Sequence, residues 1–203
     1  NVARYGGWGL GAAGGAADVL GVWVGTGFGG GLILDGKLCY GHHLTAGEIG
    51  HMLIHPKNPP GTRSLEHNCS RTAVVDRIVR LIRSNHPSML TEITNEKYEK
   101  IKSKALATAY EAGDELTVDV INDAAVLLGD QIGSIVTLLS LEKVVIGGGL
   151  TEAIGEPFVE LVRSATRDIA FPDVCKRVEV VASVLEDNAG LLGAAMIAMD
   201  KLQ

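Results

Sequence analysis

The sequence predicts an α/β protein built on a mixed sheet with helices on both faces. Three patterns support this fold class: an apolar run over residues 19–24 leads into a hairpin, a helical repeat of apolar residues extends from 118 to 139, and two later apolar runs alternate with helical segments. With 203 residues, of which 46% are hydrophobic, the chain can bury a sizeable core.

The first half of the chain begins with strands. The run Val19–Val24 predicts a buried strand, and Asp35-Gly36 predicts a two-residue turn between strands over 31–34 and 37–40. Residues 48–55 alternate enough to predict a third strand, which prolines then end. A helix is expected from Ser64, as its cap, to about Ser84, because apolar residues recur there at helical spacing.

The second half predicts helices that alternate with strands. The charged run 92–104 is expected to form an exposed helix that becomes apolar towards Ala109, and Asp114 is expected to cap a long core helix. The remaining predicted elements are a strand over 143–146, a helix over 150–168, a strand over 178–184 and a final helix that Asp187 or Asn188 caps and that runs through Met199.

Composition disfavours several classes of function. A net charge of -6 without a basic run argues against a nucleic-acid surface, which needs clustered Lys and Arg. No apolar stretch reaches the roughly 18 residues of a membrane span. The cysteines Cys39, Cys69 and Cys175 lack C-x-x-C spacing, which favours a reducing, cytoplasmic setting over a disulfide framework.

A glycine-dense segment, Gly25–Gly31, follows the first strand and suits phosphate binding. Backbone N–H groups that no side chain covers can form a nest for an anion. The segment also satisfies the dinucleotide pattern G-x-G-x-x-G, but that motif requires a helix to begin within it, whereas the next residues predict a hairpin. A P-loop is excluded because no Gly precedes Lys and then Ser or Thr, and a plain glycine-rich turn stays as the alternative.

Four motifs, in this order, resemble the ROK family of bacterial sugar kinases and sugar-responsive repressors. They are GTGFGGGLILDGKL from Gly25, GEIGH over Gly47–His51, SLE over Ser64–Glu66 and VVIGGGL over Val144–Leu150. Their spacing fits the family over essentially the whole chain. The resemblance implies one lobe of a ribonuclease H-like, actin-like ATPase fold, with a hexose, ATP and Mg²⁺ as ligands and a homodimer as the assembly.

The resemblance also implies a set of site residues. It places Glu48, His51 and Glu66 on the hydroxyls of a sugar, which carboxylates and an imidazole can bind. It places the nucleotide on two glycine loops, formed by Gly25, Thr26, Gly27, Gly29 and Gly30 and by Gly147, Gly148 and Gly149. Taken alone, Glu48 also fits an acid in a surface loop, and His51 fits a histidine in a strand. The triple glycine also fits a strand-to-helix turn. Because Glu66 belongs to neither loop, its replacement is expected to spare nucleotide affinity.

One departure from the family concerns metal. Family members usually hold zinc between the GEIGH histidine and three cysteines ahead of the Leu-Glu pair, but here that span reads HPKNPPGTRSLE and contains no cysteine. Cys69 lies after the pair, and His51 with His55 would supply only two ligands. The sequence therefore predicts no zinc, with prolines stiffening the loop instead.

The start of the chain resembles the interior of a family member. Residues 1–17 are expected to be the end of an N-terminal-lobe helix and a glycine-rich hinge, and 18–203 the C-terminal lobe; a frayed terminus is the alternative. Asn1 matches the last residue of the family's Asn-Asp-x-Asn run. The resemblance thus puts the catalytic Asp base two positions before Asn1, and no catalytic residue within the chain.

The leading functional hypothesis is ATP-dependent phosphorylation of a hexose by a glucokinase-like enzyme, with no turnover expected from these 203 residues alone. The alternative is a sugar-sensing transcriptional regulator whose DNA-binding domain is not in this chain. A dinucleotide-binding oxidoreductase is a third hypothesis, which a helix beginning near Gly30 would support.

Overall fold

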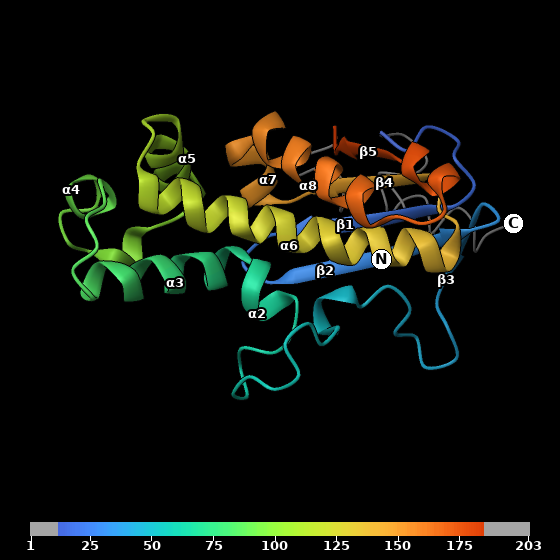
Figure 1. The fold of residues 1–203 in the computed structure, drawn as a ribbon, viewed down its shortest axis with the longest axis horizontal. Coiled ribbons are helices and arrows are strands. Elements are labelled where there is room, and N and C mark those ends of the chain that lie inside the picture. Colours follow the sequence, from blue (N-terminus) through green and yellow to red (C-terminus); the bar gives the residue numbers. More distant parts are fainter. Residues whose placement is uncertain (1–11, 185–203) are drawn as a thin grey trace, which may run out of the picture.

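The computed structural model describes residues 12–184, and within them the chain forms a five-stranded mixed sheet (Figure 1). The strands are β1 (Val19–Val24), β2 (Phe28–Leu34), β3 (Lys37–Cys39), β4 (Lys143–Gly147) and β5 (Glu179–Ala182), in the spatial order β3-β2-β1-β4-β5. The hairpin strands β1, β2 and β3 pair antiparallel, whereas β4 pairs parallel with both β1 and β5. The predicted class, a mixed sheet with helices, is confirmed.

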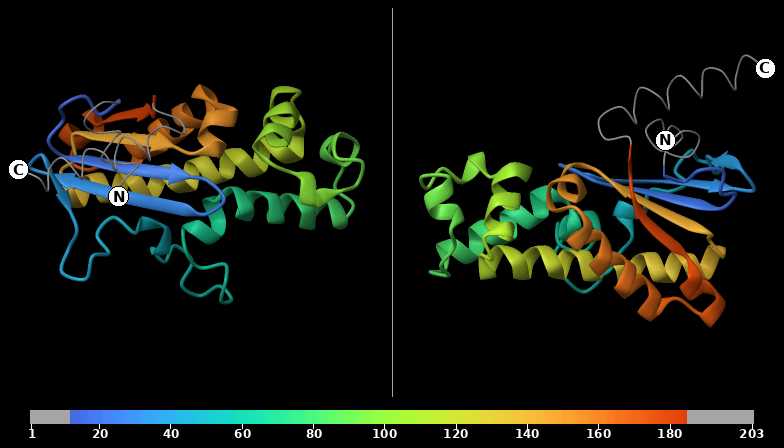
Figure 2. Two further views of the ribbon diagram at one scale, coloured as in Figure 1. Left: turned by 180° about the vertical axis from the view of Figure 1, so that it is seen from behind. Right: turned by 90° about the horizontal axis from the view of Figure 1, so that it is seen from above.

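The described helices lie between β3 and β4 and between β4 and β5 along the chain. They are α2 (Glu66–Cys69), α3 (Arg71–Arg83), α4 (Leu90–Ile93), α5 (Ser103–Glu111), α6 (Glu115–Leu139), α7 (Gly149–Ile154) and α8 (Glu156–Ile169), with 3-10 turns η1 (Ile49–His51), η2 (Tyr98–Lys100) and η3 (Asp173–Arg177). In the right-hand view of Figure 2, α6 and α8 lie on one side of the sheet. None of the helices within residues 12–184 is long and apolar enough to cross a membrane.

Side chains alternate between two cores across the sheet, as the pleat requires. Leu20 and Val22 point into the large core, to which the described helices contribute their buried side chains. Val19, Ile33 and Val145 point to the opposite face, where they pack with two alanines that precede β1 in a smaller cluster. The helices expected over 1–10 and 188–199 fall outside the described residues.

The long core helix α6 begins as predicted, with Asp114 as its N-cap. The Asp114 carboxylate accepts hydrogen bonds from the Thr117 N–H (3.1 Å) and the Ser88 hydroxyl (2.8 Å), and its other oxygen accepts from the Met89 N–H (2.8 Å). Burial raises the pKa of Asp114, but a hydrogen bond from the Thr117 hydroxyl, together with the three above, outweighs burial and holds the pKa below its ordinary value. The cap therefore fixes the start of α6 to the segment before α4.

The contact between α6 and α8 depends on two glycines of α6. A Cβ atom on Gly129 would lie 2.6 Å from the Val162 carbonyl oxygen, and one on Gly133 would lie 2.8 Å from that of Thr166. Both distances are shorter than real contacts of a Cβ atom. The two helices therefore approach more closely than any larger residue at these positions would allow.

The strand predicted over 48–55 is wrong. The segment forms the 3-10 turn η1 and a single bridge between Leu53 and Ser64. The N–H groups of Ile54 and His55 both donate to the Arg63 carbonyl, so the backbone pairs with its own loop instead of joining the sheet. The alternation of apolar residues predicted an extended segment, but it could not show whether a neighbouring strand was available to pair with it.

Three predicted helices also have different boundaries. The helix expected over 64–84 is broken at Ser70, whose side chain accepts from the Ala73 N–H and caps α3, while the Ser64 hydroxyl pairs with His67 instead. The helix expected over 150–168 is interrupted at Gly155, where φ is 73°. The charged run 92–104 is not one helix, because α4, η2 and the start of α5 divide it.

Candidate functional site

The two glycine segments lie against each other at the carboxyl edge of the sheet. Strands β1 and β4 are parallel neighbours with Trp23 opposite Gly147, so the residues that follow them meet at one edge. A Cβ atom on Gly148 would lie 2.7 Å from the Val24 carbonyl oxygen, and its φ of 95° favours glycine. In open α/β sheets this edge is where ligands bind.

The first glycine loop is a short turn, Gly25–Gly27. The Gly25 N–H donates to the Gly27 carbonyl at 3.0 Å, which closes the turn. Thr26 and Gly27 are exposed, and their own N–H groups donate to no partner within residues 12–184. Two neighbouring amides are thus available to an anion, as the phosphate interpretation requires.

Gly29 and Gly30 are not part of this loop. Both lie in strand β2, opposite Trp23 and Val22 of β1. A Cβ atom on Gly30 would overlap the carbonyl oxygen of Gly47, which crosses over the strand. Close approach of the 40–48 loop accounts for the absence of a side chain at Gly30, so the exposed part of the glycine segment is Thr26 and Gly27.

The start of α3 holds the first loop in place. The Arg71 N–H donates to the Gly25 carbonyl at 2.9 Å, and the Thr72 hydroxyl donates to the Thr26 carbonyl at 2.7 Å. The Arg71 guanidinium donates to the Thr26 hydroxyl at 2.5 Å and to the Ser103 hydroxyl at 3.2 Å. Sequence reasoning missed this anchor, because its partners lie up to 46 residues away and form no motif with it.

Glu66 also contacts the first loop. Its carboxylate accepts a hydrogen bond from the Phe28 N–H at 2.8 Å, and a Cβ atom on Gly27 would lie 3.1 Å from the same oxygen. Glu66 thus belongs to neither glycine loop, as expected, but its carboxylate binds the residue that follows the first one. Glu66, the first residue of α2, thus binds the residue after the loop, whereas Arg71 binds residues within it.

A pocket of about 510 Å³ opens beside this loop. Its lining includes Thr26 and Gly27 from the loop, Glu66 and His67 from α2, and residues along α3 that include Asp76 and Arg80. Glu48 and His51 do not line it; both are exposed at η1, which packs against α2. The structure thus brings one of the three predicted sugar-binding residues to the pocket wall and places the other two beyond it.

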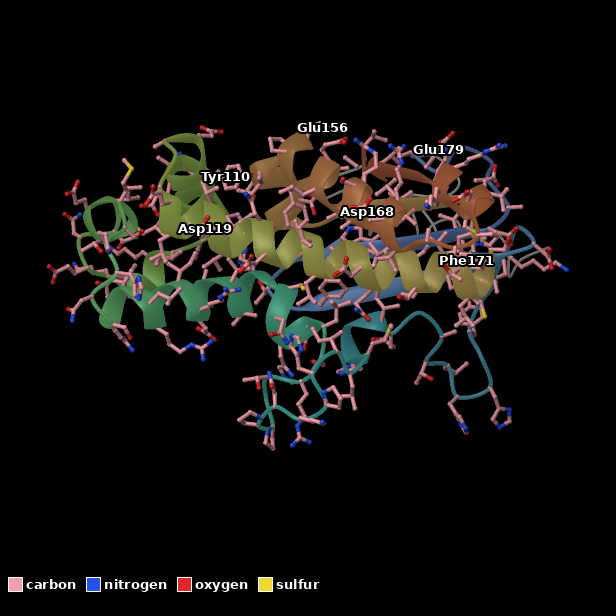
Figure 3. The ribbon with its side chains drawn as sticks, in the orientation of Figure 1. Tyr110, Asp119, Glu156, Asp168, Phe171 and Glu179 are labelled. Atoms are coloured by element: carbon pink, nitrogen blue, oxygen red, sulfur yellow. The ribbon has the colours of Figure 1, made fainter. Side chains whose placement is uncertain are left out.

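The acidic and sulfur side chains give no assembled metal site in the part of the chain that the structure describes. Figure 3 shows Asp119 on α6 and Glu156 and Asp168 on α8 spread along the helices, and residues 12–184 contain no group of three His, Cys, Asp or Glu that could hold a metal ion. Burial raises the pKa of the Cys69 thiol to about 12, which disfavours the thiolate that zinc binds. The donor set of the family's zinc is not present here.

Comparison with known proteins finds the same family. The family model described as the ROK family matches residues 1–201. Glucokinase of Halalkalibacterium halodurans is 30% identical over an alignment of 202 residues that covers 97% of this chain and 61% of that protein. This chain thus spans about three fifths of the length of that curated relative.

Solved structures match equally broadly. The ROK family glucokinase of Streptomyces griseus, in complex with glucose and AMPPNP, has a TM-score of 0.86 and 26% identity over 98% of this chain and 66% of its own. A ROK family transcriptional regulator, a homolog of the Escherichia coli MLC protein, has a TM-score of 0.84 and 26% identity over 98% of this chain and 50% of its own. A glucokinase and a transcriptional regulator of the family therefore share the fold of this chain.

Proposed function

Since the chain belongs to the ROK family, we propose that it is the C-terminal lobe of an ATP-dependent hexose kinase similar to glucokinase. Residues 18–203 form this lobe in the proposal, and 1–17 lead into it from a preceding lobe. One observation carries the proposal: the Glu66 carboxylate lines the 510 Å³ pocket and also binds the Phe28 N–H beside the first glycine loop. The acid proposed to bind the sugar and the loop proposed to bind phosphate are thus next to each other, as group transfer requires.

The proposed chemistry requires little of this lobe beyond binding and orientation. Phosphoryl transfer needs the phosphates held and the acceptor hydroxyl aligned with them. The exposed amides of Thr26 and Gly27 would donate to the phosphates, with Gly147–Gly149 against the nucleoside. Glu66 would accept from hexose hydroxyls, which places the acceptor next to the loop that holds the donor.

Glu48 and His51 are proposed to contact the sugar from its other side. Both side chains are exposed. His51 is the last residue of η1 and Glu48 directly precedes η1, which packs against the helix that carries Glu66. A hexose held by Glu66 therefore has these two groups on the neighbouring element. Mg²⁺ would enter with ATP and neutralise phosphate charge, and the base that the resemblance implies lies before Asn1.

The proposal is tested with the full-length protein, in a coupled ADP-release assay over a panel of hexoses and N-acetylhexosamines. We expect turnover with at least one hexose and none from the 203-residue chain alone. Turnover by the short chain would show that the base has been misplaced. We expect the full-length protein to be a homodimer, which light scattering would measure. We also expect it in the cytoplasm, which fractionation of cells would check.

A sugar-sensing regulator is the second candidate, and the TM-score of 0.84 to a ROK transcriptional regulator favours it almost as strongly as the kinase. The same pocket would then bind a hexose to change the affinity of a DNA-binding domain elsewhere in the protein. Sugar binding without turnover, together with sugar-dependent DNA binding by the full-length protein, would support this candidate. Turnover without DNA binding would reject it.

A further inference from the structure

Arg71 lies where three segments of the chain meet. Its guanidinium donates to the hydroxyl of Thr26 in the first glycine loop and to that of Ser103 at the start of α5. A Cβ atom on Gly149, in the second glycine loop, would lie 3.8 Å from an Arg71 guanidinium nitrogen and 3.2 Å from the Ser103 hydroxyl. The guanidinium is therefore within reach of a ligand that contacts both glycine loops.

This cation has no carboxylate partner among residues 12–184. The ion pairs in that range are made by Arg77, Lys143, Arg163 and Lys176, whereas Arg71 donates only to neutral hydroxyls. Its side chain is partly buried, and a half-desolvated cation without a counter-charge is unfavourable. An anion at this position would supply the missing charge.

The guanidinium keeps donors for that anion, and Arg71 also borders a pocket on the side of α3 and α5. A guanidinium has five N–H groups in a rigid fork that matches phosphate oxygens, and the two hydroxyls use only part of them. A pocket of about 420 Å³ opens beside Arg71, lined also by Val75, Tyr98 and Lys102. The exposed acids Asp76 and Glu99 line it as well, but neither forms an ion pair with Arg71.

We infer that Arg71 binds the polyphosphate of the nucleotide at the junction of the two glycine loops, an inference that rests on the proposed kinase function. The Thr26 and Gly27 amides would hold the phosphates from one side and the guanidinium from the other. Arg71 also ties the loop to α3 and α5, so the protein's own contacts fix the position of the loop. The residue is thus a nucleotide-binding residue that no glycine motif contains.

The test measures binding of ATP, ADP and adenosine to the full-length protein by calorimetry. Arg71→Gln should weaken ATP and ADP about tenfold to a hundredfold, as expected when a charged hydrogen bond is lost, and should leave adenosine within about twofold. Arg71→Lys keeps the charge without the planar guanidinium, so its affinity for ATP and ADP should lie between those of the wild type and Arg71→Gln. The control is Arg77→Gln on the same helix, which removes only an exposed ion pair with Asp123 and should change none of the three affinities.

The affinity ratio separates phosphate binding from loop support. Equal losses of ATP and adenosine affinity in Arg71→Gln, together with normal ATP binding in Arg71→Lys, would overturn the inference in favour of a structural anchor. If the wild type binds ATP and Arg71→Gln binds it equally well, the inference about Arg71 is overturned, but the kinase proposal is not. A wild type that binds no ATP would overturn the kinase proposal, and this inference with it.

Discussion

The Glu66 carboxylate accepts a hydrogen bond from the Phe28 N–H at 2.8 Å, which connects α2 to the strand that leaves the first glycine loop. The same carboxylate lines the pocket proposed for the sugar. One side chain is therefore shared between the acceptor site and the loop proposed for phosphate, so perturbing it should affect both ligands to different degrees.

The first prediction concerns Glu66→Gln in the full-length protein. Gln keeps one carbonyl acceptor but loses the charge and one acceptor oxygen, so loss of a charged hydrogen bond to the hexose should cost about 1.5–3 kcal/mol. That corresponds to an affinity about tenfold to a hundredfold lower. Nucleotide affinity should fall only a few-fold, because Gln can still accept from the Phe28 N–H. Calorimetry measures both, with exposed Glu92→Gln on α4 as the control; an unchanged nucleotide affinity would show that the Phe28 contact is not needed for the loop.

The second prediction separates two glycines of one motif. Gly27→Val should weaken ATP binding while the protein stays folded, because its Cβ atom meets only the end of the Glu66 side chain and the branched group covers the loop amides. Gly30→Ala should instead lower the free energy of unfolding by about 1–3 kcal/mol or more, since overlap with the Gly47 backbone forces a shift. Urea unfolding and ATP titration of both variants check this; interchanged losses would contradict the assignment of Gly30 to packing.

The third prediction concerns pH and Asp114→Asn. At neutral pH the variant should lose about 1–2 kcal/mol of unfolding free energy, because one amide NH₂ replaces an acceptor oxygen at the cap. The folded pKa of Asp114 is lowered from 3.8, so its stabilisation is fully present above that value and is lost as pH falls through the lower folded pKa. The difference between wild type and variant should therefore shrink below about pH 4.

Urea unfolding from pH 7 to pH 3 provides this measurement. Burial and the nearby Asp168 raise the pKa of Asp130, so the effect of Asp130 on stability changes with pH in the direction opposite to that of Asp114. Because both proteins contain Asp130, the difference between them cancels its contribution. Exposed Asp119→Asn on the same helix is the matched control, and a difference that stayed constant with pH would rule out the ionised cap.

The fourth prediction sets helix propensity against packing at Gly129→Ala. Alanine favours a helix over glycine by roughly 0.8–1.0 kcal/mol. The new Cβ atom would lie 2.6 Å from backbone and side-chain atoms of α8, and overpacking typically costs about 1–3 kcal/mol. We expect net destabilisation, measured by chemical denaturation, whereas exposed Ser134→Ala on α6 should be neutral or stabilising. A more stable Gly129→Ala would mean that α8 moves away without cost.

Prediction from sequence succeeded where local chemistry determines the structure. The apolar run before Gly25 and the Asp35-Gly36 turn specify β1 and the hairpin of β2 and β3, although β2 begins at Phe28, three residues before the predicted start, and Asp114 marks the start of α6. Each of these depends on residues that are neighbours in sequence. The family motifs, which preserve order and spacing, then indicated the fold class.

Prediction failed where a distant contact overrides the local pattern. Apolar spacing is continuous through Ser70, but the Arg71 N–H binds the Gly25 carbonyl, and the chain turns there between α2 and α3. The 48–55 segment alternates like a strand, yet no sheet edge pairs with it and its amides bind the Arg63 carbonyl. The contact between Glu66 and the Phe28 N–H was likewise invisible, because it spans 38 residues and involves a backbone donor.

The backbone contact between Gly148 and Val24 limits how either loop can change in length. An insertion after β1 would push into the turn after β4, and an insertion after β4 would push back, so the two turns can be lengthened only together. Redesign of the two loops should therefore leave both lengths alone. Variation belongs instead at the side chains that face the turns from α3 and α5, where Arg71 donates to the Ser103 hydroxyl.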